Sequence, residues 1–244
     1  MKRLFFACSV FLTLPMLSVS ADAQELPFTG QSLDGWTTLD GKPVSAGWTV
    51  EDGVLHLKST KGNRGGHIIT RQDFENFELT FEFKIAKKGN SGIKYRVRDF
   101  DGKTLGCEYQ IFDDTVGKKQ APNKRTASLY DVYEPKPAGL FKPNKFNTGK
   151  IVVFNNHIEH WLNGQKVVDI QVADSEWFER VGKSKFKNVQ GFGQTPFGRI
   201  MLTDHNSEAW YRNLRLRLLT PQYLPPSNAA VEPATGGIVK VKKP

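Results

Sequence analysis

Residues 77–85 read FELTFEFKI, and this stretch decides the fold class. Apolar side chains occupy every second position, and polar side chains fill the positions between them. Successive side chains of a β-strand point to opposite faces, so the segment predicts a strand that covers a hydrophobic core with one face only. We therefore expect β structure rather than helix here.

The period of two continues on both sides of this stretch. Residues 48–59, WTVEDGVLHLKS, predict two strands joined at Asp52-Gly53, a dipeptide typical of tight hairpin turns. Residues 151–170, IVVFNNHIEHWLNGQKVVDI, predict three consecutive strands. Their connections fall at Asn155-Asn156 and Asn163-Gly164, which are also turn signals.

Helical signals are scarce by comparison. Residues 175–186, SEWFERVGKSKF, predict one short helix with Ser175 as its N-cap and Glu176 in its first turn. Residues 210–219, WYRNLRLRLL, return to the strand pattern. Many short strands, each with one apolar face, favour two packed antiparallel sheets. We predict an all-β jelly-roll sandwich with one short helix in a loop.

The two ends of the chain differ from its body in composition. Lys2 and Arg3 precede an apolar run, and Ala21-Asp22-Ala23 fits the small-residue pattern of a signal-peptidase site. We expect a signal peptide at 1–23, the jelly-roll domain at 24–220, and a basic tail rich in Pro, Ala and Gly at 221–244. The expected location is periplasmic or secreted, and no later segment is apolar enough to span a membrane.

Charge and cysteine content narrow the function classes. The 244-residue chain carries a formal net charge of +9, but its Lys and Arg residues are dispersed, so we expect no nucleic-acid partner. After removal of the signal peptide only Cys107 remains, so no intramolecular disulfide can form. Cys107 is predicted to be a small core residue rather than a nucleophile.

Two segments supply the first candidate site residues. In residues 106–114, GCEYQIFDD, core-facing residues alternate with Glu108 and Gln110. In residues 89–100, GNSGIKYRVRDF, the same alternation places Arg96 on a polar face. If the two strands pair, these three side chains share one polar surface of the sheet. The alternative is an ordinary solvated face with a cross-strand ion pair.

Histidines near strand ends, with their neighbours, form a second set of candidate site residues. His160 and Trp161 are adjacent, so only one of them can face the polar side of its strand. His160 is a candidate catalytic group or a structural histidine, and Trp161 is a candidate sugar-stacking platform or a core residue. Asp204 and His205 follow the apolar run GRIMLT. A metal site built from His160, His205 and nearby carboxylates is the alternative, but no ligand pair has the close spacing of known metal motifs, so we expect no metal and no cofactor.

Taken together, these segments resemble the 3-keto-disaccharide hydrolase family. The resemblance runs from FTGQSLDGW (28–36) to YRNLRLRLL (211–219), and it is carried by the order and spacing of individually weak motifs. They are GWTVEDGVL, DFENFELTFEFKI, NSGIKYRVRD, CEYQIFDD, SLYDVYEPKPAG, NNHIEHWLNGQKVVD, SEWFERVGKSKF and LTDHNSEAWYRNLRL. The family implies a concanavalin A-like jelly roll with two curved antiparallel sheets, in agreement with the strand pattern.

The resemblance also implies an exported hydrolase whose substrates are 3-keto-glycosides and 3-keto-disaccharides. A ketone at C3 acidifies the C2 hydrogen, so a base can remove it and the C1 substituent can leave by β-elimination, as in a lyase. Water can then add to the enone. This chemistry needs a base near C2, an acid near the glycosidic oxygen and hydrogen-bond donors at the C3 oxygen.

Family motifs assign these roles to particular residues of this chain. The implied catalytic residues are Glu108, His160, Asp204 and His205, and both His160 and Glu108 are open as the base. The implied or predicted substrate-binding residues are Arg96, Gln110, Tyr130, Trp161 and Lys185. The family often has Asp-His-Gly where this chain has Asn206 after Asp204-His205. Asn tolerates positive φ, so the turn can persist.

Two other functions remain open at this stage. A non-catalytic carbohydrate-binding module of the cell envelope can use the same fold, because a fold does not fix a function. A structural envelope protein can use the basic tail to contact an anionic polymer. Convergence of Glu108, His160 and Asp204-His205 in one cleft would favour the enzyme, and their location on opposite faces would contradict a catalytic site made of all of them.

Overall fold

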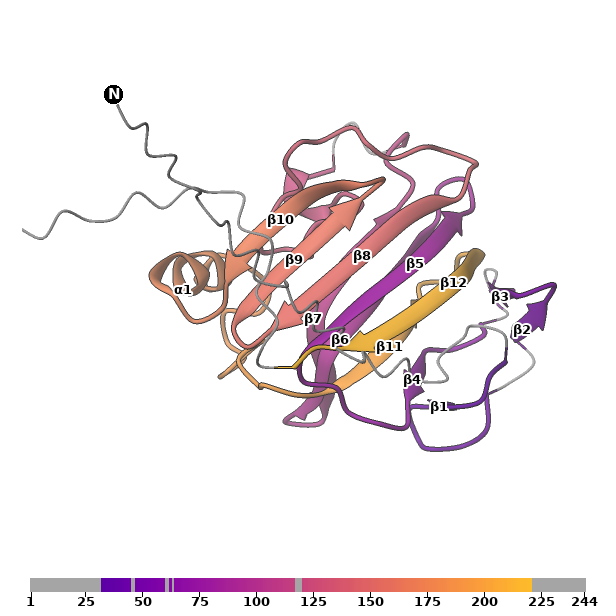
Figure 1. Cartoon of the computed structure of the whole chain (residues 1–244), viewed down its shortest axis with the longest axis horizontal. Helices are drawn as coiled ribbons and strands as arrows, with labels where there is room; N and C mark the ends of the chain where they lie inside the picture. The colour runs from indigo at the N-terminus through magenta and orange to yellow at the C-terminus, as the bar shows by residue number, and fades with distance from the viewer. Residues whose placement is uncertain (1–31, 45–46, 60–61, 63, 117–119, 221–244) are drawn as a thin grey trace, which may run out of the picture.

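The computed structural model of the chain describes residues 32–44, 47–59, 62, 64–116 and 120–220 (Figure 1). These residues are mostly β structure, with a single α-helix among them. The strands are β1 (Trp36–Thr38), β2 (Trp48–Glu51), β3 (Val54–Leu57), β4 (Ile68–Thr70), β5 (Phe77–Ile85), β6 (Asn90–Phe100), β7 (Lys103–Phe112), β8 (Asn147–Phe154), β9 (His157–Leu162), β10 (Gln165–Gln171), β11 (Arg199–Asp204) and β12 (Ala209–Leu218). The helices are η1 (Pro122–Lys124, 3-10) and α1 (Ser175–Gly182).

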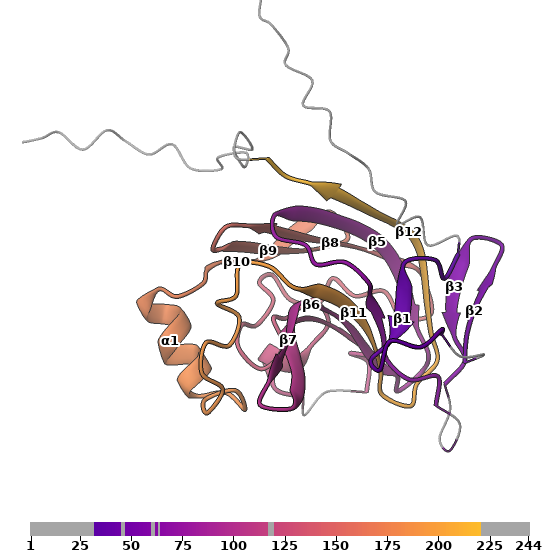
Figure 2. The same ribbon diagram turned by 90° about the horizontal axis from the view of Figure 1, so that it is seen from below.

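The strands form two antiparallel sheets that pack face to face. One has five strands in the order β1-β4-β11-β6-β7, and the other has seven in the order β10-β9-β8-β5-β12-β3-β2. Figure 2 shows the two layers edge-on, with β8, β5 and β12 in the upper layer and β6, β7 and β11 in the lower one. The predicted jelly-roll sandwich of concanavalin A type is confirmed.

The core lies between the sheets, and strand alternation explains it. Along β5, in the middle of the seven-stranded sheet, buried and half-buried residues alternate strictly from Phe77 to Ile85. Each fully buried Leu or Phe side chain contributes roughly 1.5–3 kcal/mol through removal of apolar surface from water. Cys107 on β7 is also fully buried, and burial raises the pKa of its thiol to about 12, so it is an unreactive core residue as predicted.

The predicted helix is correct in place but shorter, and its N-cap is different. Helix α1 ends at Gly182 rather than near residue 186, and its N-cap is Asp174, whose carboxylate accepts the backbone N–H of Trp177. Asp is as good a cap as Ser, and position 174 has the extended backbone that a cap requires. The buried Trp177 ring stacks on Phe192, with ring centroids 6.2 Å apart, which anchors the helix to the sandwich.

Two predicted segments, the signal peptide at 1–23 and the tail at 221–244, lie outside the described residues. No helix of the described residues is long and apolar enough to cross a membrane.

Candidate active site

The outer face of the five-stranded sheet, which is turned away from the other sheet, carries a group of polar side chains. β6 and β7 pair with Lys94 opposite Glu108 and Gly92 opposite Gln110. β11 pairs with β6 so that Thr203 lies opposite Gly92. Three neighbouring strands therefore bring these positions together on one face. The Glu108 cluster comprises Glu108 and the side chains around it: His67, Lys94, Tyr130, Lys185, Thr203 and His205.

Glu108 is the buried carboxylate at the centre of this cluster. It is 4% exposed, Thr203 Oγ1 donates to its Oε1 at 3.4 Å, and His205 Nε2 lies 3.9 Å from the same oxygen. Burial alone raises the pKa of the Glu108 carboxyl, but His205 and the charges of Lys94 and Lys185 outweigh burial and hold that pKa below its usual value. Glu108 is therefore an anion at neutral pH.

Gly92 makes room for the Glu108 side chain. A Cβ at position 92 would stand 2.4 Å from Glu108 Oε1, closer than any real contact. The absence of a side chain lets the carboxylate lie over β6 and reach β11, where Thr203 and His205 are located. The close approach of the Glu108 carboxylate to the β6 backbone thus explains why residue 92 is a glycine.

Two loops supply Tyr130 and Lys185, whereas Lys94 comes from β6. The backbone N–H of Tyr130 donates to the Glu108 carbonyl at 2.9 Å, and the backbone N–H of Lys185 donates to Asp131 at 2.7 Å. The Lys185 ammonium lies 4.2 Å from the centroid of the Tyr130 ring. Partial burial lowers the pKa of Lys185, and the charge of Lys94 lowers it further, against the opposing charge of Glu108.

His67 precedes β4 and joins the cluster from the side of β11. Its Nδ1 accepts the backbone N–H of Asp204 at 2.9 Å, and its ring contacts His205 edge-on with centroids 5.8 Å apart. Burial, aided by the charges of Lys94 and His205, lowers the pKa of His67 to about 4. The ring is neutral at physiological pH, and because Nδ1 is an acceptor, the proton is on Nε2.

Asp204 positions its neighbours rather than facing the cluster. Its side chain is fully buried and accepts the backbone N–H groups of Gly66 at 2.9 Å and Asn206 at 2.8 Å. Burial raises the pKa of Asp204, but the nearby Ser59 hydroxyl and the hydrogen bonds from the Gly66 and Asn206 backbone outweigh burial and leave that pKa lowered. Asn206 has φ +62°, so the turn after His205 forms without glycine.

Gln110 lies beside Glu108 on the same face, but it serves a structural bond. It is 2% exposed, and its Nε2 donates to Asn90 Oδ1 at 3.0 Å. Sequence analysis placed Gln110 on the same face as Glu108, and the structure places it there. Its side chain has little surface left to offer a substrate.

His160 lies in the core, away from the Glu108 cluster. It is 0% exposed, its Nε2 accepts the Tyr95 hydroxyl at 2.8 Å, and its Nδ1 donates to the Ala127 carbonyl at 3.0 Å. Burial lowers the pKa of His160 to about 4, so it is neutral. Ile158 and Leu162 share its strand face, so the alternation that predicted β9 also places His160 on the apolar side.

Arg96 is likewise absent from the polar face, because β6 contains a bulge. The register of β6 with β7 shifts between Tyr95 and Arg98, and Arg96 has φ +52°. The bulge reverses the alternation, so Arg96 is 1% exposed and donates to the backbone carbonyls of Gly193, at 3.0 Å, and Asn155. The prediction that Arg96 shares a surface with Glu108 was therefore wrong, and Lys94 is there instead.

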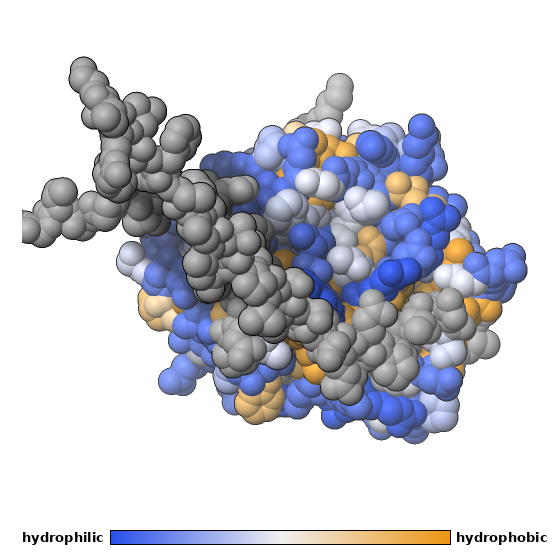
Figure 3. Space-filling model, in the orientation of Figure 1, coloured by the Kyte–Doolittle hydropathy of each residue, from blue (hydrophilic) through white to orange (hydrophobic). Residues whose placement is uncertain are grey.

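Trp161 lies on the outer face of the other, seven-stranded sheet. Its Nε1 donates to Glu159 at 2.7 Å, and the Lys150 ammonium lies 3.9 Å from its ring centroid. It lines a pocket of about 530 Å³ together with residues such as Thr148 and Arg215. This face is turned to the viewer in Figure 3 and is largely hydrophilic. Trp161 and Glu108 thus belong to different sheets.

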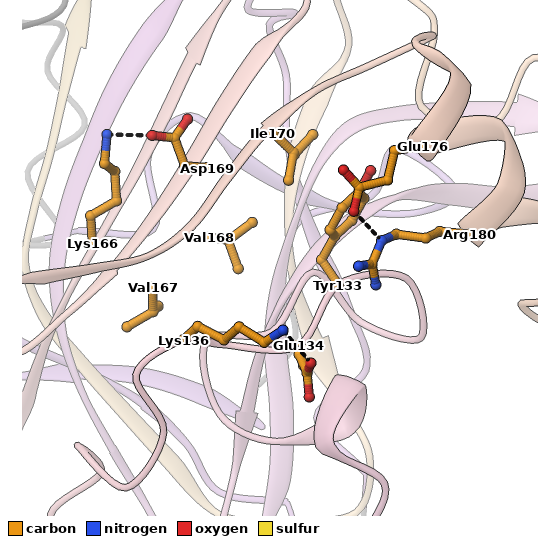
Figure 4. Close-up of a pocket in the computed structure, with 10 residues that line it drawn as sticks. All are labelled: Tyr133, Glu134, Lys136, Lys166, Val167, Val168, Asp169, Ile170, Glu176 and Arg180. Atoms are coloured by element: carbon orange, nitrogen blue, oxygen red, sulfur yellow. Dashed lines mark hydrogen bonds and ion pairs between the residues drawn. The ribbon is translucent and has the colours of Figure 1, made fainter. Parts of the chain in front are cut away.

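Another pocket, of about 320 Å³, lies between β10 and α1 (Figure 4). Its charged side chains are paired with one another: Lys136 with Glu134 at 2.8 Å, Lys166 with Asp169 at 2.5 Å and Arg180 with Glu176 at 2.8 Å. None of the predicted site residues lines it.

Potential metal ligands among the described residues gather at His157, Glu159 and Asp169, whose ligand atoms lie within 4.8 Å of one another. The Lys166 ammonium lies 3.1 Å from Glu159 and 2.5 Å from Asp169, so it supplies the positive charge that these carboxylates need.

Comparison with known proteins identifies the family. Residues 23–217 match the family model of the 3-keto-alpha-glucoside-1,2-lyase-like domain. The chain belongs to this family. It is also 30% identical over 237 residues to a 3-keto-disaccharide hydrolase of Bacteroides thetaiotaomicron, with 83% of this chain and 81% of that protein covered. The family resemblance inferred from the motifs is confirmed.

Solved structures are also similar to this chain. Two proteins of Parabacteroides distasonis, each proposed to be a glycosyl hydrolase, are similar to this chain. One has a TM-score of 0.69 and 26% identity, covering 78% of this chain and 92% of the other. The second has a TM-score of 0.65 and 25% identity, covering 80% of this chain and 100% of the other.

In this member of the 3-keto-alpha-glucoside-1,2-lyase-like family, sequence analysis missed three residues of the Glu108 cluster: Thr203, Lys94 and His67. Lys94 alternates with core residues before the bulge, so its side of the strand was readable, but its position opposite Glu108 required the register. His67 stands before a three-residue strand, and its contact with Asp204 spans 137 positions. Local pattern carries no signal for a contact at that separation.

Proposed function

We propose that this chain is an exported enzyme that cleaves 3-keto-glycosides, including 3-keto-disaccharides, by elimination and hydration. The observation that carries the proposal is the buried anionic Glu108 beside the partly exposed His205 and between two lysines. Family membership adds the substrate class, since the Bacteroides relative is named a 3-keto-disaccharide hydrolase. The signal-like residues 1–23 support export.

The proposed roles follow from exposure. Glu108 has almost no accessible surface, whereas the His205 side chain is 37% exposed and can touch a sugar. His205 therefore accepts the C2 proton, and Glu108 orients the ring and stabilises the imidazolium that forms. Lys94 and Lys185 stabilise the negative charge that develops on the C3 oxygen. The half-buried Tyr130 contacts the sugar.

The steps balance without an external oxidant or reductant. Removal of the C2 proton places the electron pair in an enolate on the C3 oxygen. The enolate reforms the ketone, the C1–C2 double bond forms, and the C1–O bond breaks. The leaving oxygen takes a proton from the His205 imidazolium. Water then adds its hydroxyl to C1 and a proton to C2, so one water is consumed per bond cleaved. No pair of carboxylates is required, unlike in a retaining glycosidase.

To test the proposal, purified protein comprising residues 24–244 is incubated with a chromogenic 3-keto-glucoside and, separately, with its unoxidised parent. The expected result is release from the keto substrate alone, with loss of release in His205→Ala. Release from the unoxidised parent would contradict elimination. No release from either substrate, together with measurable oligosaccharide binding, would favour a carbohydrate-binding module instead.

A further inference from the structure

A neutral imidazole with one free donor stands at the edge of the Glu108 cluster. The backbone N–H of Asp204 occupies His67 Nδ1 at 2.9 Å, which leaves the proton on Nε2. Among the described residues, His67 Nε2 has no hydrogen-bond partner, and the residue is only half-buried. An N–H group in this position is available to a ligand.

The donor lies where the developing charge is expected. Where β4 pairs with β11, Ile68 lies opposite Leu202 and Ile69 lies opposite Met201. His67 immediately precedes Ile68 in the chain. On the other side of β11, Met201 lies opposite Lys94 of β6. The His67 ring also touches His205, the proposed proton acceptor, edge-on. His67 thus contacts the group proposed to remove the C2 proton, and it is near enough to the Lys94 ammonium for that charge to lower its pKa.

We propose that His67 donates its Nε2–H to the C3 oxygen of the substrate and strengthens that bond as the enolate forms. This inference rests on the proposed function, and it adds a residue that the family motifs did not supply. A neutral donor suits this task, because Lys94 and Lys185 already bring two positive charges to the cluster and a third would be costly, whereas an N–H dipole is held in place by the Asp204 bond. Its pKa, lowered to about 4 by burial, keeps the His67 ring neutral at physiological pH.

Two isosteric substitutions separate this role from a structural one. Asn places its Oδ1 near the Nδ1 position, so His67→Asn keeps the acceptor for Asp204 but lacks the Nε2 donor. Gln places its amide near the Nε2 position, so His67→Gln keeps a donor toward the substrate and weakens the Asp204 bond. We expect kcat to fall about a hundredfold in His67→Asn, with KM within threefold, and to stay within about fivefold of wild type in His67→Gln. A purely structural His67 would give the reverse order.

A binding measurement tests the role of His67 without relying on cleavage of a substrate. Nitrogen-15 NMR of the full chain follows His67 while a 3-keto-1,5-anhydroglucitol, which has no C1 leaving group, is added. A neutral Nε2–H tautomer whose resonance shifts on addition supports the proposal, and an Nδ1–H tautomer or an unmoved resonance overturns it. If wild type cleaves keto-glycosides and His67→Asn is as active, the inference fails alone. If wild type cleaves none, the proposed function fails, and the NMR result still decides whether His67 binds the keto sugar.

Discussion

Gly92 lies directly beneath the carboxylate of Glu108, so that a methyl group at position 92 would stand 2.4 Å from Oε1. The carboxylate reaches His205 across β6 only because that position has no side chain. The geometry of the proposed proton-transfer pair therefore depends on a glycine on β6, the strand that pairs with β11, which His205 follows.

Gly92→Ala should displace Glu108 with little effect on the fold. We expect kcat/KM to fall at least about tenfold, since small misplacements of catalytic groups are costly. Gly182→Ala is the matched control, because a Cβ there meets nothing within 4 Å. Steady-state kinetics with a 3-keto-glucoside, together with thermal melting, check this. Equal activities of the two variants would show that the position of the Glu108 carboxylate is not critical.

Glu108→Gln keeps the shape of the side chain and removes its charge. The imidazolium of His205 would lose its counter-ion, so we expect kcat to fall by about 10² or more, with a smaller change in KM. Glu78→Gln on the seven-stranded sheet serves as the control and should stay within twofold of wild type. Activity of Glu108→Gln close to that of the control would remove Glu108 from the mechanism.

His160 should matter for stability and not for chemistry. His160→Ala deletes a buried ring and leaves the Tyr95 hydroxyl and the Ala127 carbonyl without their partner, so we expect a loss of about 3–5 kcal/mol in the free energy of unfolding. Urea unfolding measures that loss, and kcat per folded molecule should be unchanged below the unfolding transition. Normal stability with abolished kcat would restore His160 as a catalytic group.

The same residue predicts how stability depends on pH. The pKa of His160 is lowered from 6.5 to about 4 in the folded protein, so below pH 6.5 the unfolded chain binds a proton that the folded protein does not. Stability should therefore fall as pH decreases from 6.5 to 4, with His160 contributing about 1.4 kcal/mol per pH unit. The slope of unfolding free energy against pH should be shallower in His160→Gln by that amount. Identical slopes in both proteins would contradict a buried neutral His160.

Strand pattern predicted the fold well because alternation reports burial directly. FELTFEFKI reads as a half-buried strand, and β5 has that burial pattern along its whole length. The same rule places His160 on the core side, since Ile158 and Leu162 are on the same face of β9. The neighbouring Trp161, which fits a sugar-binding site, favoured a functional interpretation of His160 instead. A β-bulge, by contrast, reverses the alternation locally, and nothing in the residues RVR (96–98) indicates one. For this reason sequence analysis assigned Arg96 to the wrong face of the sheet.

The site was only partly readable from sequence. Glu108 and His205 were named from motifs, and the structure brings them within 3.9 Å. Their neighbours Lys94 and His67 depend on strand register and on a contact between distant segments. Trp161 and Glu108 were grouped by chemistry, but a sandwich has two outer faces, and parity within one strand does not say to which sheet a strand belongs.

Solvent deuterium incorporation tests the central claim most directly. A 3-keto-disaccharide is cleaved in D2O for a short time, and the released keto sugar is analysed by mass spectrometry and NMR, with the free keto sugar incubated in parallel to measure background exchange. Elimination followed by hydration predicts one deuterium at C2 of the product above background, with product formation suppressed in Glu108→Gln. Product that carries only hydrogen at C2 would show direct hydrolysis at C1 and would contradict the account.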